Sequence, residues 1–171
     1  MAGRHVVALD LVRHGATVHG EEGRFSGWAR VPLSADGRRQ AREVGRSLRG
    51  RRYDGVWSSD LPRAMETARL ASLDAVIDPR LRELDFGELE GARWEDIPAN
   101  LQAELVTFDG FRAPGGESVD ELRERVRSFI SDLAPGAHLL VTHGGVIRSL
   151  LRQAGRDETV PHGGLVRLEN P

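Results

Sequence analysis

The chain has 171 residues, of which 39% are apolar and 29% charged, and this balance is typical of a soluble protein with one sizeable core. Its formal net charge of -2 provides no overall positive field, so we expect neither nucleic acid nor a membrane as a partner. The lack of cysteine excludes disulfides, cysteine-ligated zinc and a cysteine nucleophile. No segment has the composition of a signal peptide or the length of a membrane span, so we predict a single cytoplasmic domain over residues 1–171, a monomer or homodimer.

Short apolar runs alternate with helical patterns along the chain. Strands are predicted at residues 6–12, 53–58, 75–77, 138–142 and 165–168, the last of them at a sheet edge. Helices are predicted from residue 34 or 36 to about 48, from 60–62 onward, near 100–106, from 118 onward and over 146–153. Residues 15–33 and most of 83–116 are predicted to be irregular. This alternation predicts an α/β fold, a three-layer α/β/α sandwich with a mostly parallel central sheet.

Two histidines stand where a predicted strand gives way to a loop. His14 and His143 each follow an apolar run, and each is followed by glycine, which lets a backbone approach a ligand closely. The carboxyl ends of strands in an open α/β sheet converge on one crevice. His14 could act there as a nucleophile beside the phosphate-binding Arg13, and His143 as an imidazolium clamp. Taken singly, each histidine could also merely close a strand.

Arg63 and Glu83 are further candidates for chemistry on an anion. Arg63 stands in the first turn of its predicted helix, where the helix N-terminus also favours anions. Leu84 and Phe86 could desolvate the carboxyl group of Glu83 and so suit it to proton transfer. Considered apart from the two histidines, Arg63 is more simply interpreted as an exposed arginine on an arginine-rich chain, and Glu83 as a solvated loop carboxylate.

The sequence gives less support to the other histidines as site residues and to other classes of hydrolase. The other histidines do not precede glycine at a strand end, so we expect surface or structural roles for His5, His19, His138 and His162. A Ser-His-Asp hydrolase would need a Gly-x-Ser-x-Gly elbow, which the chain lacks. A metal hydrolase would need closely spaced histidine and carboxylate ligands. We therefore expect no metal and no cofactor.

Together these segments resemble the histidine phosphatase superfamily of phosphoglycerate mutase-like proteins, in its small phosphatase branch. The resemblance covers nearly the whole chain, in ordered blocks at residues 11–15, 23–28, 58–64, 81–87, 115–118 and 141–145. It implies a phosphomonoesterase of a small phosphorylated metabolite, with His14 becoming a phosphohistidine. Arg13, Arg63 and His143 would hold the phosphoryl oxygens, and Glu83 would protonate the leaving oxygen and then activate water. The resemblance further implies that substrate binding involves Thr17, Ser26, Gly27 and Gly144.

The chain departs from the family pattern at two positions. Gly20 stands where the family usually has asparagine, and Ala16 where glutamate is common. Loss of one transition-state donor typically costs about 10²–10³ in rate. His19, or the backbone N–H of Gly20, could substitute for the missing amide. A weakly active phosphate-binding regulatory protein therefore stays an alternative.

A phosphoglycerate mutase is the other alternative. The predicted lid, residues 92–114, has only Arg93 and Arg112 as cations, which favours hydrolysis over retention of a small anionic intermediate. Trp94, Phe108 and Phe111 could instead contact a bulkier phosphate ester.

Overall fold

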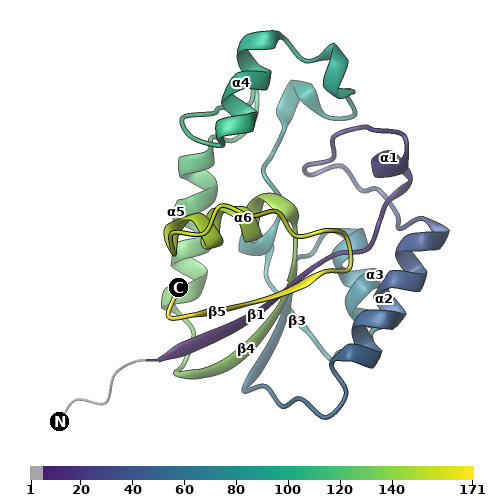
Figure 1. Ribbon diagram of the computed structural model, residues 1–171, viewed down its shortest axis with the longest axis vertical. Coiled ribbons are helices and arrows are strands. Elements are labelled where there is room, and N and C mark those ends of the chain that lie inside the picture. The colour runs from purple at the N-terminus through teal and green to yellow at the C-terminus, as the bar shows by residue number, and fades with distance from the viewer. Residues whose placement is uncertain (1–5) are drawn as a thin grey trace.

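The computed structural model describes residues 6–171 and shows a sheet with helices on both faces (Figure 1). Its strands are β1 (Val7–Arg13), β2 (Gly55–Ser58), β3 (Val76–Ile77), β4 (Gly136–Thr142) and β5 (Leu165–Glu169). They are ordered β3-β2-β4-β1-β5 in space. All neighbours pair in parallel except β5, which lies antiparallel to β1 at the predicted edge. The predicted mostly parallel α/β fold is confirmed.

Helices cover both faces of this sheet. The α-helices are α1 (Val18–Glu21), α2 (Ala35–Ser47), α3 (Pro62–Leu70), α4 (Ala99–Thr107), α5 (Val119–Ser131) and α6 (Gly144–Gln153). Single turns of 3-10 helix occur at Pro79–Leu81, Gly87–Leu89 and Trp94–Asp96. None of the helices in residues 6–171 combines the length and apolar character needed to cross a membrane.

Local signals explain where the helices begin. The Ser34 hydroxyl accepts a hydrogen bond from the Gly37 N–H, and Ser118 forms a capping box with Glu121, as its sequence pattern predicts. The predicted loop at 15–33 contains one short helix, α1, whose N-cap is Thr17. Helix α6 begins at Gly144, two residues earlier than predicted, because His143 is its N-cap residue.

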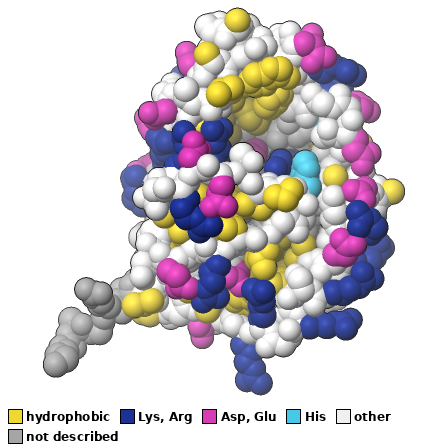
Figure 2. Space-filling view, viewed as in Figure 1, with side chains coloured by type: hydrophobic (Ala, Val, Ile, Leu, Met, Phe, Trp, Pro, Cys, Tyr) yellow, Lys and Arg dark blue, Asp and Glu magenta, His cyan; other side chains and the backbone are white. Residues whose placement is uncertain are grey.

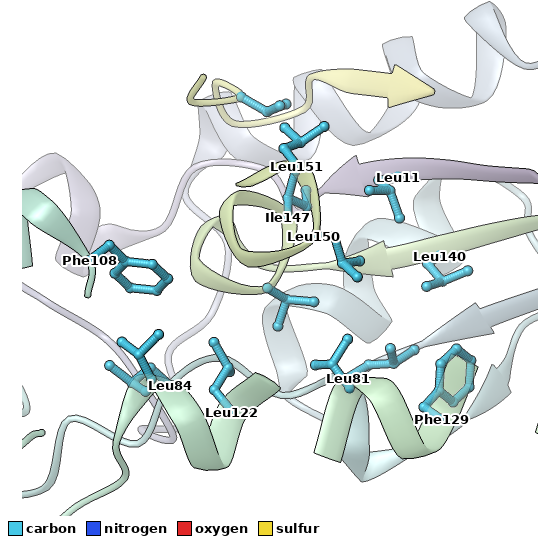
Figure 3. Packing of buried hydrophobic residues seen from close by; sticks show 14 of the residues in the cluster. Leu11, Leu81, Leu84, Phe108, Leu122, Phe129, Leu140, Ile147, Leu150 and Leu151 are labelled. Carbon is cyan, nitrogen blue, oxygen red and sulfur yellow. The ribbon is translucent and has the colours of Figure 1, made fainter. Parts of the chain in front are cut away.

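Alternate side chains of the central strands enter two separate cores. Val12, Leu139 and Val141 pack against α2 and α3, whereas Leu11 and Leu140 pack against α5 and α6. Figure 3 shows Leu11 and Leu140 of the sheet beside Leu150 of α6. A parallel sheet that is apolar on both faces requires this double covering. The two cores hold the ends of β1 and β4 rigidly in register.

A cap made of residues 83–116 stands above the carboxyl ends of these strands (Figure 1). Phe108, in a left-handed conformation with φ 51°, ends α4 and is buried. The Arg148 guanidinium of α6 lies 5.1 Å from the Phe108 ring centroid and donates to the carbonyls of Leu105 and Val106. These contacts fasten the cap to the helix that follows β4.

Candidate active site

The two histidines that follow strands meet at one edge of the sheet. Arg13 pairs with Thr142 across the parallel β1–β4 ladder, so the chain leaves both strands at the same level. His14 and His143 therefore lie side by side, with ring centroids 5.0 Å apart. Strand order alone brings together residues that are 129 positions apart in the sequence.

The contacts of His14 determine its tautomer. Its Nδ1 lies 2.7 Å from the carbonyl oxygen of Gly15. A carbonyl can only accept, so Nδ1 carries the proton and Nε2 carries the lone pair. Burial above all, and then the charge of Arg63, hold the pKa of His14 well below its ordinary value. His14 is therefore a neutral imidazole whose Nε2 carries the electron pair and accepts a hydrogen bond from Arg63 Nε at 3.3 Å, and the neutral form is the one required of a nucleophile.

Arg63 stands beside that electron pair. It belongs to the first turn of α3, where Pro62 is tolerated, and is only 1% exposed. Its Nε lies 3.3 Å from Nε2 of His14. Its Nη2 donates to the carbonyls of Ser26 and Gly27, at 3.1 and 2.6 Å. These bonds orient the guanidinium, so its charge is fixed at the nucleophile before any substrate arrives.

Arg13 provides a second cation at the same place. Its Nη1 donates to the carbonyl oxygen of Val160 at 2.8 Å. Its Nε is buried and has no partner among the described residues. Burial lowers the pKa of Arg13, whereas the charge of Glu83 opposes that shift. An unsatisfied buried donor of this kind is consistent with a site that awaits an anion.

His143 is completely buried beside Ser59, in the segment between β2 and α3. Its Nε2 lies 2.8 Å from the hydroxyl oxygen of Ser59, and its Nδ1 has no partner among residues 6–171. Burial chiefly, and then Arg63, hold the pKa of His143 well below its ordinary value. The ring is therefore neutral in the free protein, and an imidazolium clamp on the transferring group stays a prediction.

Glu83 faces the start of α6. Its Oε1 accepts from the N–H of Leu84 at 2.9 Å, and its Oε2 from the N–H of Gly145 at 3.1 Å. A Cβ atom on Gly145 would overlap the Glu83 carboxylate, and one on Gly144 would lie 3.2 Å from the guanidinium carbon of Arg13. The two glycines after His143 therefore admit the side chains of Glu83 and Arg13.

These groups line a cavity of about 610 Å³ between the sheet edge and the cap. Its polar base includes Arg13, His14, Arg63 and Glu83. Its upper walls are apolar and are formed by Phe25, Phe86, Trp94, Leu105, Val106 and Phe108. Figure 2 shows the hollow, with apolar side chains above it and a histidine beside basic side chains at its base. The cavity therefore has an anion-binding end and an apolar end.

The other predicted site residues divide into two groups. Thr17, Ser26 and Gly144 line the cavity. Gly27 and His143 lie behind its wall, where the Gly27 N–H donates to Glu90 Oε1 at 2.8 Å. Across residues 6–171 no group of three or more histidine and carboxylate side chains could hold a metal ion.

Two sequence expectations about individual residues, His162 and Phe111, need correction. His162 lines the cavity instead of lying on the surface, with its ring centroid 5.4 Å from that of His14. Phe111 is fully buried in the core and does not line the cavity, because its carbonyl accepts from the Val119 N–H at the start of α5, at 3.0 Å. His19 does not line the cavity, in agreement with the expected surface or structural role, and its Nδ1 lies 3.1 Å from the Ser26 hydroxyl. His138 is structural, as predicted, and His5 lies outside the described residues.

A sequence signal for His162 does exist. The triplet His162-Gly163-Gly164 repeats His143-Gly144-Gly145, and both histidines reach the same site. The first triplet follows a long apolar run, whereas the second follows a polar segment and precedes a short edge strand. Only the triplet at 143–145 therefore has the sequence context of a strand end.

Comparisons with known proteins agree with this geometry. The sequence profile of the histidine phosphatase superfamily (branch 1) matches residues 9–167. The chain is 41% identical over 147 residues to a probable phosphoglycerate mutase GpmB of Enterobacter sp. (strain 638), covering 78% of this chain and 68% of that protein.

Solved structures are similar over most of the chain. The protein TTHB049 from Thermus thermophilus superposes with a TM-score of 0.90 at 44% identity, covering 96% of this chain and 94% of the other. A candidate alpha-ribazole-5'-P phosphatase from Escherichia coli superposes with a TM-score of 0.82 at 29% identity, covering 96% and 91%.

Proposed function

The chain belongs to the histidine phosphatase superfamily, branch 1, and we propose that it is a metal-independent phosphomonoesterase acting on a small phosphorylated metabolite. The observation that carries this proposal is the neutral His14, which lines the cavity and whose Nε2 accepts a hydrogen bond from the buried cation of Arg63. A nucleophile of this kind beside fixed cations suits phosphoryl transfer, in which the protein supplies positioning and charge stabilisation.

In the first step His14 Nε2 attacks phosphorus, and the bond from phosphorus to the ester oxygen breaks. Glu83, at the same cavity, gives a proton to the departing alkoxide. Arg13 and Arg63 stabilise the charge on the non-bridging oxygens, with His143 behind them. The product of this step is a phosphohistidine and a free alcohol.

In the second step water attacks the phosphohistidine. The Glu83 carboxylate accepts a proton from that water, the bond from phosphorus to His14 Nε2 breaks, and inorganic phosphate leaves. Glu83 acts as a general acid in the first step and as a general base in the second, so a single buried carboxyl group is sufficient.

The apolar end of the cavity supports hydrolysis over mutase activity. The basic side chains near it have partners: Arg148 donates to the cap carbonyls, and Arg24 bonds Glu22 and the carbonyl of Gly91. Arg112 of the cap pairs with Glu121. Among the described residues, the cations that line the cavity beside its apolar wall, Arg24 and Arg148, are both engaged by backbone carbonyls, and Arg93 of the cap does not line it, so an ester with an uncharged, apolar body fits better than a phosphoglycerate.

A phosphoglycerate mutase stays the second candidate, because the matching GpmB relative is named as a probable one. The test supplies 3-phosphoglycerate with 2,3-bisphosphoglycerate and follows isomerisation and phosphate release together, beside hydrolysis of an aryl phosphate. We expect hydrolysis of the aryl phosphate, unaffected by EDTA, to be the faster reaction. Isomerisation that outruns phosphate release would contradict the proposal and favour the mutase.

A further inference from the structure

His162 is held at the base of the cavity by the backbone of the two glycines that follow it. The N–H of Gly163 donates to the carbonyls of Arg13 and His14, at 3.0 and 3.2 Å, and the N–H of Arg13 donates to the carbonyl of Gly164 at 3.0 Å. This turn is therefore fastened to the end of β1, next to the nucleophile. It places the His162 ring centroid 5.4 Å from that of His14.

The imidazole of His162 stabilises the fold through no hydrogen bond of its own. It makes no side-chain hydrogen bond to any residue in 6–171, in contrast to His14, His138 and His143. Burial, together with the charges of Arg13 and Arg63, lowers the pKa of His162 to about 4. At neutral pH it is therefore an uncharged ring with one N–H to donate, half-buried and beside two arginines.

Gly20 leaves the space that this ring occupies. Gly20 lies in α1, where its N–H donates to Thr17 Oγ1 at 3.0 Å. A Cβ atom there would lie 3.2 Å from Thr17 Oγ1 and in ordinary contact, 3.7 Å, with Cε1 of His162, so a longer side chain that continues toward His162 would meet the imidazole. Gly20, which has no side chain, thus lies next to the imidazole of His162, which has no hydrogen-bond partner among residues 6–171.

We propose that His162 is a further catalytic residue, which donates a ring N–H hydrogen bond to the phosphoryl group held at His14, and that Gly20 makes room for it. A neutral donor fixed beside two cations adds a hydrogen bond to a phosphoryl oxygen without adding another charge to the site. The chemistry of this step rests on the proposed function, but the contact itself concerns only the binding of a phosphoryl-like anion.

The test measures binding of vanadate by calorimetry at pH 7, which requires no turnover. His162→Gln keeps an N–H donor, whereas His162→Leu keeps much of the volume and has no donor. We expect affinity to fall about 10- to 100-fold in His162→Leu, the effect of one hydrogen bond to a charged group, and less than about threefold in His162→Gln. Glu158→Gln, an exposed residue of the same loop, is the matched control and should bind as the wild type does.

A second arm tests the spatial pairing with Gly20. Gly20→Leu should displace the imidazole and weaken vanadate binding about 10-fold in the wild-type background, but much less in His162→Ala, where no donor is left to lose. Melting temperatures of all variants separate this effect from unfolding. Equal losses in His162→Gln and His162→Leu, no loss in either, or a Gly20→Leu effect that persists in His162→Ala would each overturn the proposal.

The outcome also separates this inference from the proposed function. A wild-type protein that binds vanadate yet hydrolyses no phosphate ester would contradict the proposed function and leave the His162 contact to be decided by the binding data. A wild-type protein that does not bind vanadate would overturn both.

Discussion

At the scale of single residues, the chemistry of this site depends on hydrogen bonds that select one protonation state. The Gly15 carbonyl directs the proton of His14 to Nδ1, and so leaves the Nε2 electron pair toward Arg63. Burial keeps the ring uncharged near pH 6.5, where half of the histidine side chains exposed to water would be protonated. The backbone therefore activates the nucleophile without help from a carboxylate.

Replacement of His14 by alanine should abolish turnover and leave the fold intact. Without the Nε2 electron pair no phosphohistidine can form, so we expect kcat to fall by at least about 10³-fold, as in other enzymes that lose a nucleophile. Phosphate-release assays measure the loss, and acid-labile, base-stable labelling of the wild type by a radioactive substrate locates the intermediate. Near-wild-type activity in His14→Ala would contradict the assignment of the nucleophile.

Replacement of Glu83 by glutamine should slow turnover in a way that depends on the leaving group. A general acid matters most when the departing alkoxide is a strong base. We expect kcat/KM to fall about 10²- to 10⁴-fold for an alkyl phosphate and much less for p-nitrophenyl phosphate.

Glu88→Gln is the matched control for this variant, since Glu88 is an exposed carboxylate of the same segment that does not line the cavity. It should leave both rates unchanged. Equal losses on both substrates in Glu83→Gln would remove the acid role from Glu83.

At the scale of secondary-structure elements, the start of α6 combines several functions in three residues. His143 is the N-cap residue, the Gly145 N–H holds the Glu83 carboxylate, and Gly144 allows Arg13 to pass. Neither glycine has a positive φ, so their small size, and not an unusual backbone conformation, explains their presence.

Gly145→Ala tests this explanation, because its Cβ would overlap Glu83 Oε1. We expect the new methyl group to displace the carboxylate and to lower activity on alkyl phosphates about as much as Glu83→Gln does. In the Glu83→Gln background the same change should cost little more, since coupled residues are not additive. Additive losses in the double variant, measured as kcat/KM, would show that Gly145 acts elsewhere.

At the scale of the whole molecule, the site is assembled from the carboxyl ends of parallel strands and closed by the cap. Three of its histidines are neutral because the fold buries them near Arg63. Their pKa values in the folded protein lie below the ordinary value of 6.5. At pH values between these lowered pKa values and 6.5, the unfolded chain therefore binds more protons than the folded chain does. The stability that depends on these histidines is present above pH 6.5 and is lost as the pH falls.

We therefore expect the free energy of unfolding to decrease as the pH falls from about 6.5 to 4. The part due to His162 should stop changing below its pKa of about 4. Urea unfolding at pH 7, 6, 5 and 4 measures the trend, and His162→Gln, which cannot titrate, should show a shallower decrease. A wild-type stability that stays level from pH 7 to 5 would be incompatible with neutral, buried histidines.

The sequence by itself determined the strands and the longer helices, and it proposed most of the candidate site residues, because these depend on local signals. Apolar runs of the right length mark β1 and β4, the Ser118 pattern marks the capping box, and His14 and His143 stand where a strand must end. Each of these signals is contained within a few consecutive residues, whose backbone conformation they favour directly.

Only the tertiary structure decided which side chains share the cavity and in what chemical state. The parallel pairing of β1 with β4 sets the 5.0 Å between the two histidine rings, and the chain reversal before β5 brings in His162. Phe108 reaches the cavity whereas Phe111, three residues later, is buried in the core. Contacts between distant segments and the removal of water determine these outcomes, and neither is a property of any short stretch of sequence.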